Sequence, residues 1–394
     1  MNNQKTKFTV NIGQLKLGFE QVNRVIGRAT EFVSLVGRPG SLEIQKSLST
    51  TFCKFNMAAP GCEDFQMTID GVRLRALLAT ADPTKDVVLV INRDTNKLEV
   101  SFGNAKIKIP DLGRETMLIS EAAWNAKDEL LSVKGADIKA ALKQVVGLCA
   151  DEKDVRYYLR GVFFTSEEID GVKKLVLVGT DGHILTMRNT DVILPECWVD
   201  AVVPEAIIRA LIPCLGDDED VRLTSFSAKE QPLGVGFKTP SFEVVTPTIA
   251  GKFPDWRRVI PEISARQKAT IKRIELLASA TRMGLVGELY GKQSPVKLSF
   301  SDDGSDLVIS DVRLVEDDES FDLVPLNLDQ SDESFGATNW FGGFNHALLE
   351  EALSPATDEF VDIYCDPAFS TDPKKESLLI MGEGWKTVVM PMKI

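Results

Sequence analysis

The sequence has few histidines and cysteines, the residues that most zinc sites use. Its 394 residues include only two histidines, His183 and His346, and six cysteines without a Cys-x-x-Cys pair. Neither histidine flanks a cysteine at the spacing of zinc ligands, so we expect no metal site. Scattered cysteines are typical of free thiols in a reducing compartment.

Long apolar runs are also missing. No stretch approaches the ~18 consecutive apolar residues of a membrane span, and the N-terminal MNNQKTKFTV lacks the apolar centre of a signal peptide. We therefore expect a soluble, cytoplasmic protein that contacts no membrane. Walker, Rossmann, G-x-S-x-G and H-E-x-x-H motifs are absent as well, so no cofactor is expected.

The formal net charge of −13, taken alone, argues against nucleic-acid binding. Much of the acidity is local, however, because residues 301–340 hold twelve Asp and Glu against the single basic residue Arg313. A basic face elsewhere on the molecule is compatible with this distribution.

Six segments with helical periodicity recur at starts about 58 to 73 residues apart. They begin at Asn11, Ile69, Lys134, Val203, Ile271 and Phe344. Runs of β-rich sequence such as KKLVLVGT (173–180) and SDLVISDV (305–312) lie between them and predict antiparallel strands. One helix plus about four strands makes a unit, and two units make a domain. We therefore predict an α+β fold with three similar domains, at residues 1–125, 126–260 and 261–394.

Several predicted helices share a basic bias. Lysines and arginines lie on or just after four of the six, including Lys16, Arg24, Arg28, Arg73, Arg75, Lys139, Lys143, Lys153, Arg156, Lys272, Arg273 and Arg282. For one helix alone, an ordinary solvated face explains such charges. The same bias on four repeated helices favours a common basic surface.

The stretch Thr180-Asp181-Gly182-His183 follows a predicted strand and resembles an acid–base pair. Such a pair needs a nucleophile and a third group that orients the histidine, and no motif supplies either. In a tight turn, Asp can bond its own backbone and Gly can adopt a positive φ. We interpret the stretch as a turn, with a binding surface as the next alternative and catalysis as the last.

Four strings in register resemble those of a known family. They are DVRYYLRGVFF (154–164), TDGHILTMR (180–188), GKFPDWRRVIP (251–261) and VVMPMKI (388–394). Together they resemble the bacterial DNA polymerase III β subunit, the sliding clamp, over essentially the whole chain and weakly between residues 31 and 68. The resemblance implies a DNA clamp fold in which each domain packs two helices on antiparallel sheets. Two chains would close head to tail into a ring around duplex DNA.

The resemblance also implies a pocket for linear peptides between the second and third domains. Its lining by carry-over would be Leu159, Thr180, Gly182, His183, Leu185, Pro254, Arg258, Val259, Asn345, Leu378, Val388, Val389, Met390, Pro391 and Met392. The implied partners are the replicative polymerase, the clamp loader and repair polymerases. Where the family usually has an arginine and an aromatic residue, this chain has Ile184 and Leu348. We expect a more apolar pocket with a peptide preference of its own.

DNA contacts and a ring seam follow from the same resemblance. The DNA-facing candidates are Arg28, Arg73, Lys153 and Arg156, and they would meet phosphates without regard to base sequence. The seam candidates are Ile107, Ile109 and Leu285, for which burial inside the domain is an equally open alternative.

The expected function is a non-enzymatic, nucleoid-associated processivity factor, with a monomeric clamp-fold binding module as the alternative. The acidic segment from Leu326 to Thr338 has no assigned role.

Overall fold

The computed structural model describes residues 5–27, 31–102, 105–113, 131–196, 198–228, 231–264, 266–288, 295–311, 320–332, 340–365 and 377–392. Contacts divide the chain into two compact units. Unit 1 comprises Met1–Lys139 with Leu194–Thr248, and unit 2 comprises Ala140–Ile193 with Ile249–Ile394. The predicted domain boundary near residue 125 lies outside the described residues. That boundary and the one near residue 260 stay predictions.

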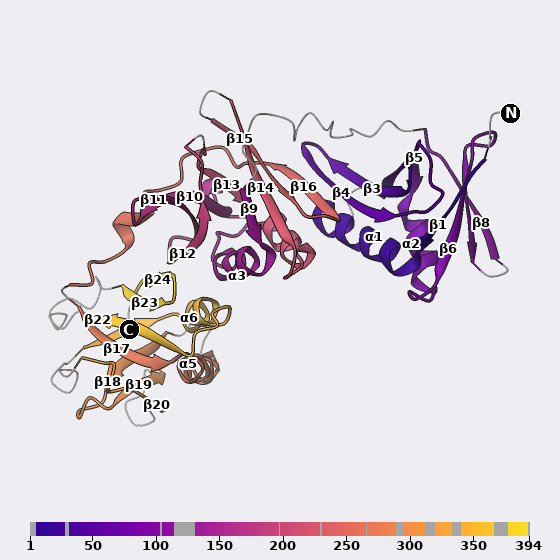
Figure 1. The fold of residues 1–394 in the computed structure, drawn as a ribbon. Helices are drawn as coiled ribbons and strands as arrows, with labels where there is room; N and C mark the ends of the chain where they lie inside the picture. Colours follow the sequence, from indigo (N-terminus) through magenta and orange to yellow (C-terminus); the bar gives the residue numbers. More distant parts are fainter. Residues whose placement is uncertain are drawn as a thin grey trace. The chain divides into compact units, whose positions relative to one another are not determined.

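Unit 1 contains a long antiparallel sheet with the strand order β5-β2-β3-β4-β16-β15-β14-β9 (Figure 1). Its strands are β2 (Phe32–Arg38), β3 (Ser41–Leu48), β4 (Thr51–Ala58), β5 (Phe65–Asp70), β9 (Leu131–Lys134), β14 (Asp220–Ala228), β15 (Gln231–Lys238) and β16 (Phe242–Pro247). Cross-strand pairs such as Phe52 with Val245 join two distant segments of the chain in this sheet. A second sheet follows the order β1-β6-β7-β8, with β1 (Lys5–Asn11), β6 (Asp86–Asn92), β7 (Lys97–Phe102) and β8 (Ala105–Pro110).

Each helix of unit 1 begins where a strand ends. The helices are α1 (Ile12–Ile26), α2 (Gly71–Ala79) and α4 (Glu205–Leu211), the last preceded by β13 (Ala201–Pro204), and α3 (Gly135–Val146) begins here and ends in unit 2. Side-chain caps start two of them: Asn11 accepts from the Gln14 N–H at 3.1 Å and Asp70 from the Val72 N–H at 2.9 Å. The buried face of α1 packs on β3 and β4.

Unit 2 contains a sheet in which the strands β10-β11-β12-β24-β23-β22-β17 are neighbours in that order. Its strands are β10 (Gly161–Ile169), β11 (Val172–Thr180), β12 (Ile184–Ile193), β17 (Gln267–Lys272), β22 (Phe360–Cys365), β23 (Leu378–Gly382) and β24 (Trp385–Val389). The other sheet, β20-β19-β18-β21, consists of β18 (Val296–Phe300), β19 (Asp306–Asp311), β20 (Phe321–Pro325) and β21 (Phe341–Phe344). Helices α5 (Arg273–Glu288) and α6 (His346–Leu353) lie side by side (Figure 1). They pack on a core that both sheets share.

The α+β prediction is confirmed, and all six predicted helical segments are helical. The strands β2 to β5 fill the region where the sequence resemblance was weak. In the part of the chain that the structure describes, no helix is long and apolar enough to cross a membrane. No cluster of His, Cys, Asp and Glu among those residues could hold a metal ion. Cys53, Cys62, Cys149, Cys214 and Cys365 form no disulfide there, and Cys197 lies outside the described residues.

Candidate functional site

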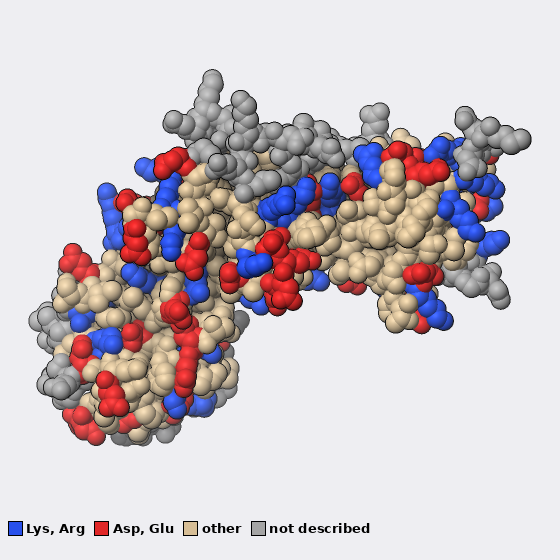
Figure 2. Space-filling view, viewed as in Figure 1, with Lys and Arg blue, Asp and Glu red and all other residues tan. Residues whose placement is uncertain are grey.

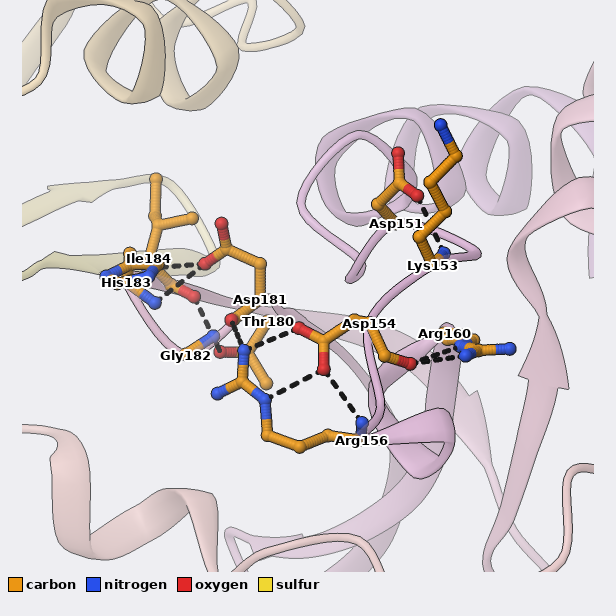
Figure 3. A network of polar contacts seen from close by, with 10 residues as sticks. All are labelled: Asp151, Lys153, Asp154, Arg156, Arg160, Thr180, Asp181, Gly182, His183 and Ile184. Carbon is orange, nitrogen blue, oxygen red and sulfur yellow. Dashed lines mark hydrogen bonds and ion pairs between the residues drawn. The ribbon is translucent and has the colours of Figure 1, made fainter. Parts of the chain in front are cut away.

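The stretch from Thr180 to His183 forms the turn between β11 and β12 (Figure 3). The Asp181 carboxylate accepts the backbone N–H groups of His183 at 2.7 Å and Ile184 at 2.9 Å. Gly182 has a φ of +89°, a conformation that side-chain-bearing residues rarely adopt. Thr180 accepts the Gly182 N–H at 3.1 Å and donates its hydroxyl to the Ile184 carbonyl at 2.6 Å. Asp181 therefore serves the backbone of the turn, as the turn interpretation predicted.

This turn forms one wall of a pocket of about 190 Å³ that lies within unit 2. The segment from Arg156 to Leu159, the loop from Phe253 to Val259 and the end of β24 form the other walls. The lining residues are Arg156, Tyr158, Leu159, Thr180, Gly182, His183, Ile184, Leu185, Phe253, Pro254, Trp256, Val259, Val388 and Met390. Most of these side chains are apolar, as is usual for sites that bind organic ligands or peptide side chains.

The register between β12 and β24 brings distant apolar residues together in the pocket. Leu185 pairs with Val388, and both line it. Their neighbours Ile184 and Val389 also pair, and both are almost completely buried in the core of unit 2. Ile184 also lines the pocket, so this strand pair joins the pocket wall to the core beneath it.

Two aromatic residues from the loop 253–259 support the pocket. Phe253 stacks on Phe163 with ring centroids 4.4 Å apart. Trp256 is 2% exposed, and the Arg257 guanidinium lies over its ring, 4.4 Å from the centroid. The Trp256 indole N–H is buried without a hydrogen-bond acceptor among the described residues.

A charged network holds Arg156 at the pocket (Figure 3). The Asp154 carboxylate accepts from Arg156 Nε at 3.0 Å and from Nη2 at 2.6 Å, and Nη2 also donates to the Asp181 carbonyl at 2.8 Å. The hydrogen bonds from Arg156 lower the pKa of Asp154 to about 2. Asp154 therefore stays ionised at neutral pH, and the guanidinium is tied to both the 151–160 loop and the Asp181 turn.

The structure brings together many of the residues that the sequence predicted for the pocket. Those in the lining are Leu159, Thr180, Gly182, His183, Leu185, Pro254, Val259, Val388 and Met390. Ile184, which the resemblance placed at a pocket position, also lines it. Four further lining residues were not predicted for it: Arg156, Tyr158, Phe253 and Trp256. All four belong to the same sequence strings as the predicted residues, so proximity to those residues was the available signal.

Other predicted pocket residues have different surroundings. The Arg258 side chain is 84% exposed and pairs with Asp255 at 2.9 Å. Asn345 caps α6 by accepting the Ala347 N–H at 3.0 Å. Leu378 and Val389 lie in the core, and the Met392 N–H donates to the Gly343 carbonyl at 2.8 Å. These residues and Pro391 are not part of the lining, so their role at the site stays a prediction.

The predicted DNA and seam residues are spread over both units. Arg73 is exposed on α2 and pairs with Asp70, and Lys153 is exposed in the 151–160 loop. Leu285 is 57% exposed and Ile107 partly exposed, whereas Ile109 is fully buried within unit 1. Arg28 lies outside the described residues, as does the acidic segment beyond Asp332 up to Thr338. The DNA-facing and seam assignments, including that of Arg156, stay predictions.

Comparison with known proteins relates this chain to the bacterial beta sliding clamps. Residues 132–255 match the family model of the DNA polymerase III beta subunit, central domain. The beta sliding clamp of Caulobacter vibrioides is 24% identical over 342 residues, which cover 84% of this chain and 82% of the relative. A crystal structure of the sliding clamp of Pseudomonas aeruginosa superposes with a TM-score of 0.80 at 21% identity. It covers 98% of this chain and 99% of that chain.

The chain has the fold of the bacterial beta sliding clamps. A crystal structure of the beta sliding clamp of Caulobacter crescentus also superposes, with a TM-score of 0.79 at 19% identity over the full length of both chains. The beta sliding clamp of Borreliella burgdorferi is 25% identical over 248 residues, 61% of each chain. The predicted resemblance to the DNA polymerase III β subunit is therefore confirmed.

Proposed function

We propose that this chain is a sliding clamp, which encircles duplex DNA as a ring of two chains and tethers partner proteins through the pocket of unit 2. The observation that carries the proposal is this pocket, set between the Thr180–His183 turn and the end of β24 in a clamp fold. The proposed role is that of a processivity factor, which holds a polymerase on DNA and catalyses no reaction.

The chemistry of the pocket suits a short peptide with apolar anchor residues. Leu159, Leu185, Val259 and Val388 offer aliphatic surface, and Met390 can adapt its shape to several partners. The proposed partners are a replicative polymerase, a clamp loader and repair polymerases, each of which would supply a linear motif. Two pockets in one ring would raise the local concentration of bound partners without any new contact.

The charges on the helices fit encirclement better than tight DNA binding. Arg24 and Lys143 are exposed, but Arg73, Lys139, Arg209 and Arg282 each pair with a nearby carboxylate. On the face drawn in Figure 2, acidic side chains also run over α5 and α6. Contacts of this kind would meet phosphates weakly and be screened by salt, as a protein that slides requires.

Two other functions compete with this proposal. An enzyme that used Asp181 and His183 would need the Asp181 carboxylate, which already bonds two backbone N–H groups of the turn. A monomeric binding module with the clamp fold would use the pocket but not close a ring. The solution mass separates this second alternative from the clamp.

Peptide binding is the first test of the pocket. A labelled peptide of the type Gln-Leu-x-Leu-Phe is titrated with the intact chain and with a chain that lacks residues 390–394. A finer comparison sets Met390→Asp against Ile193→Asp. Ile193 is 62% exposed at the far end of β12, so its substitution makes the same kind of change away from the pocket.

We expect the intact chain and Ile193→Asp to bind, and the truncation and Met390→Asp to bind at least about tenfold more weakly. Burying a carboxylate against apolar walls without a partner costs at least ~2 kcal/mol. Equal binding by all four proteins would contradict the pocket assignment, and failure of the folded intact chain to bind would contradict the tethering role.

A further inference from the structure

Arg156 is the only lysine or arginine among the described residues that line the pocket, and no carboxylate side chain lines it. In isolation, a guanidinium at the edge of an apolar pocket would attract an acidic peptide or a free C-terminal carboxylate, since it forms strong paired hydrogen bonds with such groups. The net charge that a bound peptide meets therefore depends on what neutralises Arg156.

Asp154 neutralises it from outside the lining. Its two carboxylate oxygens accept from Nε at 3.0 Å and Nη2 at 2.6 Å, which is the bidentate geometry of a strong ion pair. The Asp154 side chain is 20% exposed and that of Arg156 is 39% exposed. The Asp181 carbonyl also accepts a hydrogen bond from Nη2, at 2.8 Å. The guanidinium therefore cannot turn away from Asp154 without losing this further bond.

The remaining nitrogen, Nη1, faces the turn. A side-chain carbon added at Gly182 would overlap it, so the glycine leaves the room that the guanidinium occupies. No hydrogen bond involving Nη1 is found among the described residues, which leaves this group available as a donor at the pocket. Ile184, which follows His183, brings no second cation to the lining.

We propose that Asp154 sets the charge preference of the pocket: by compensating Arg156, it makes the site favour uncharged apolar peptides over acidic ones. An acidic group that entered would meet the carboxylate of Asp154 directly behind the guanidinium and would give up its hydration for little net attraction. Selectivity of this kind comes from a repulsive element built beside an attractive one. The inference rests on the proposed peptide-binding function.

A purely structural role for Asp154 needs to be separated from this one. The same carboxylate accepts the backbone N–H of Arg156 at 2.8 Å, and the Asp154 carbonyl accepts from Arg160 Nε at 2.8 Å. A substitution could therefore loosen the loop and weaken every peptide alike. A change in the ratio of affinities for neutral and acidic peptides is the readout that loosening would not produce.

The experiment uses pairs of peptides that differ only by an amide and a carboxylate. One pair carries Gln or Glu at the first position of the motif, and the other has an amidated or a free C-terminus. Wild type, Asp154→Asn, Arg156→Gln and Asp151→Asn are titrated with all four at pH 8, where histidine is ordinarily uncharged. Asp151 is the matched control, because it is an exposed carboxylate of the same loop whose one hydrogen bond among the described residues is from the Lys153 N–H, at 2.7 Å. Circular dichroism verifies the fold of each variant.

We expect wild type to prefer the neutral member of at least one pair. Asp154→Asn should shift that preference toward the acidic member by about fivefold or more, as removal of one charge a few ångströms from the peptide would do. Arg156→Gln should shift it the opposite way, and Asp151→Asn should leave it unchanged. An unchanged ratio in folded Asp154→Asn, or an equal shift in Asp151→Asn, would overturn the inference while leaving peptide binding intact. If wild type bound none of the four peptides, the proposed function itself would fail.

Discussion

The residues of the Thr180–His183 turn show how side chains that suggest catalysis in the sequence can build a binding wall. The Asp181 carboxylate accepts the backbone N–H groups of His183 and Ile184, and the Asp181 carbonyl accepts a hydrogen bond from Arg156. The turn therefore fixes the position of the guanidinium at the pocket. We therefore expect a small change in the turn to affect the pocket more than the stability of the fold.

Gly182→Ala tests this coupling. At a φ of +89° an alanine costs about 1 kcal/mol or more, and its side chain would also overlap Arg156 Nη1. We expect a modest loss of stability and a loss of peptide affinity of roughly tenfold, measured by thermal melting and peptide titration.

Gly171→Ala is the matched control for that substitution. Gly171 has a φ of +73° in the turn before β11, but a side-chain carbon there would meet nothing within 4 Å. It should lose similar stability and keep its peptide affinity. If both alanine variants lost affinity equally, the coupling between the turn and Arg156 would be wrong.

At the scale of elements, the sequence predicted the helices well and the strands unevenly. The helices carry clear apolar periodicity and polar caps such as Asn11, Asp70 and Asn345. By contrast, five successive residues of β2 are buried, namely Val33, Ser34, Leu35, Val36 and Gly37. Its sequence therefore lacks the alternation of apolar and polar residues that would predict a strand. Strands that are covered on both faces lose the period-two signal on which such a prediction depends.

The pocket could be predicted only in part, for a related reason. The quoted strings supplied its apolar members through the resemblance, but the pairing of Leu185 with Val388 depends on strand register across 200 residues of chain. For the same reason, the bonds of Arg156 to Asp154 and Asp181 could not be predicted from the sequence, and its DNA-facing assignment stays a prediction.

Helix packing in unit 2 offers a test at this scale. Gly284 on α5 lies where a side-chain carbon would overlap the imidazole of His346 on α6. We expect Gly284→Ala to destabilise unit 2 by about 1–3 kcal/mol, because the two helices would have to move apart. The midpoint of urea unfolding, followed by tryptophan fluorescence, measures this change.

Gly147→Ala is the control for the helix substitution. A side-chain carbon at Gly147 meets nothing within 4 Å, and the position has no positive φ. The urea midpoint of this variant should match that of wild type. If Gly284→Ala were as stable as the control, the α5–α6 contact would accommodate the added side-chain carbon without a loss of stability.

At the scale of the whole molecule, two sheet edges need an explanation. In the described sheets β8 is an edge strand of unit 1 and β20 an edge strand of unit 2. Leu285, Phe321 and Leu323 are between 48% and 61% exposed on α5 and β20, whose residues are in contact. In Figure 2, lysine and arginine side chains gather over the part of unit 1 that holds β1 and β8. An edge strand with exposed apolar neighbours, as β20 has, invites pairing with another chain.

The proposed ring would satisfy both edges if β8 of one chain met β20 of its partner. Leu285→Asp would then place an unpaired carboxylate in the seam, at a cost of at least ~2 kcal/mol for each of two symmetric contacts. We expect sedimentation to change from the mass of two chains to that of one. Peptide affinity should be unchanged, since the pocket lies within unit 2. Retention on closed circular DNA, which only a ring confers, should be lost.

Leu328→Asp provides the control for Leu285→Asp, because Leu328 is 62% exposed in the same unit outside these two elements. It should sediment as two chains and stay on circular DNA. If Leu285→Asp still sedimented as two chains, the seam would have to be formed by other residues. If wild type itself sedimented as one chain and still bound peptide, the pocket would work without a ring, and the chain would be a clamp-fold binding module that exposes two unpaired edges.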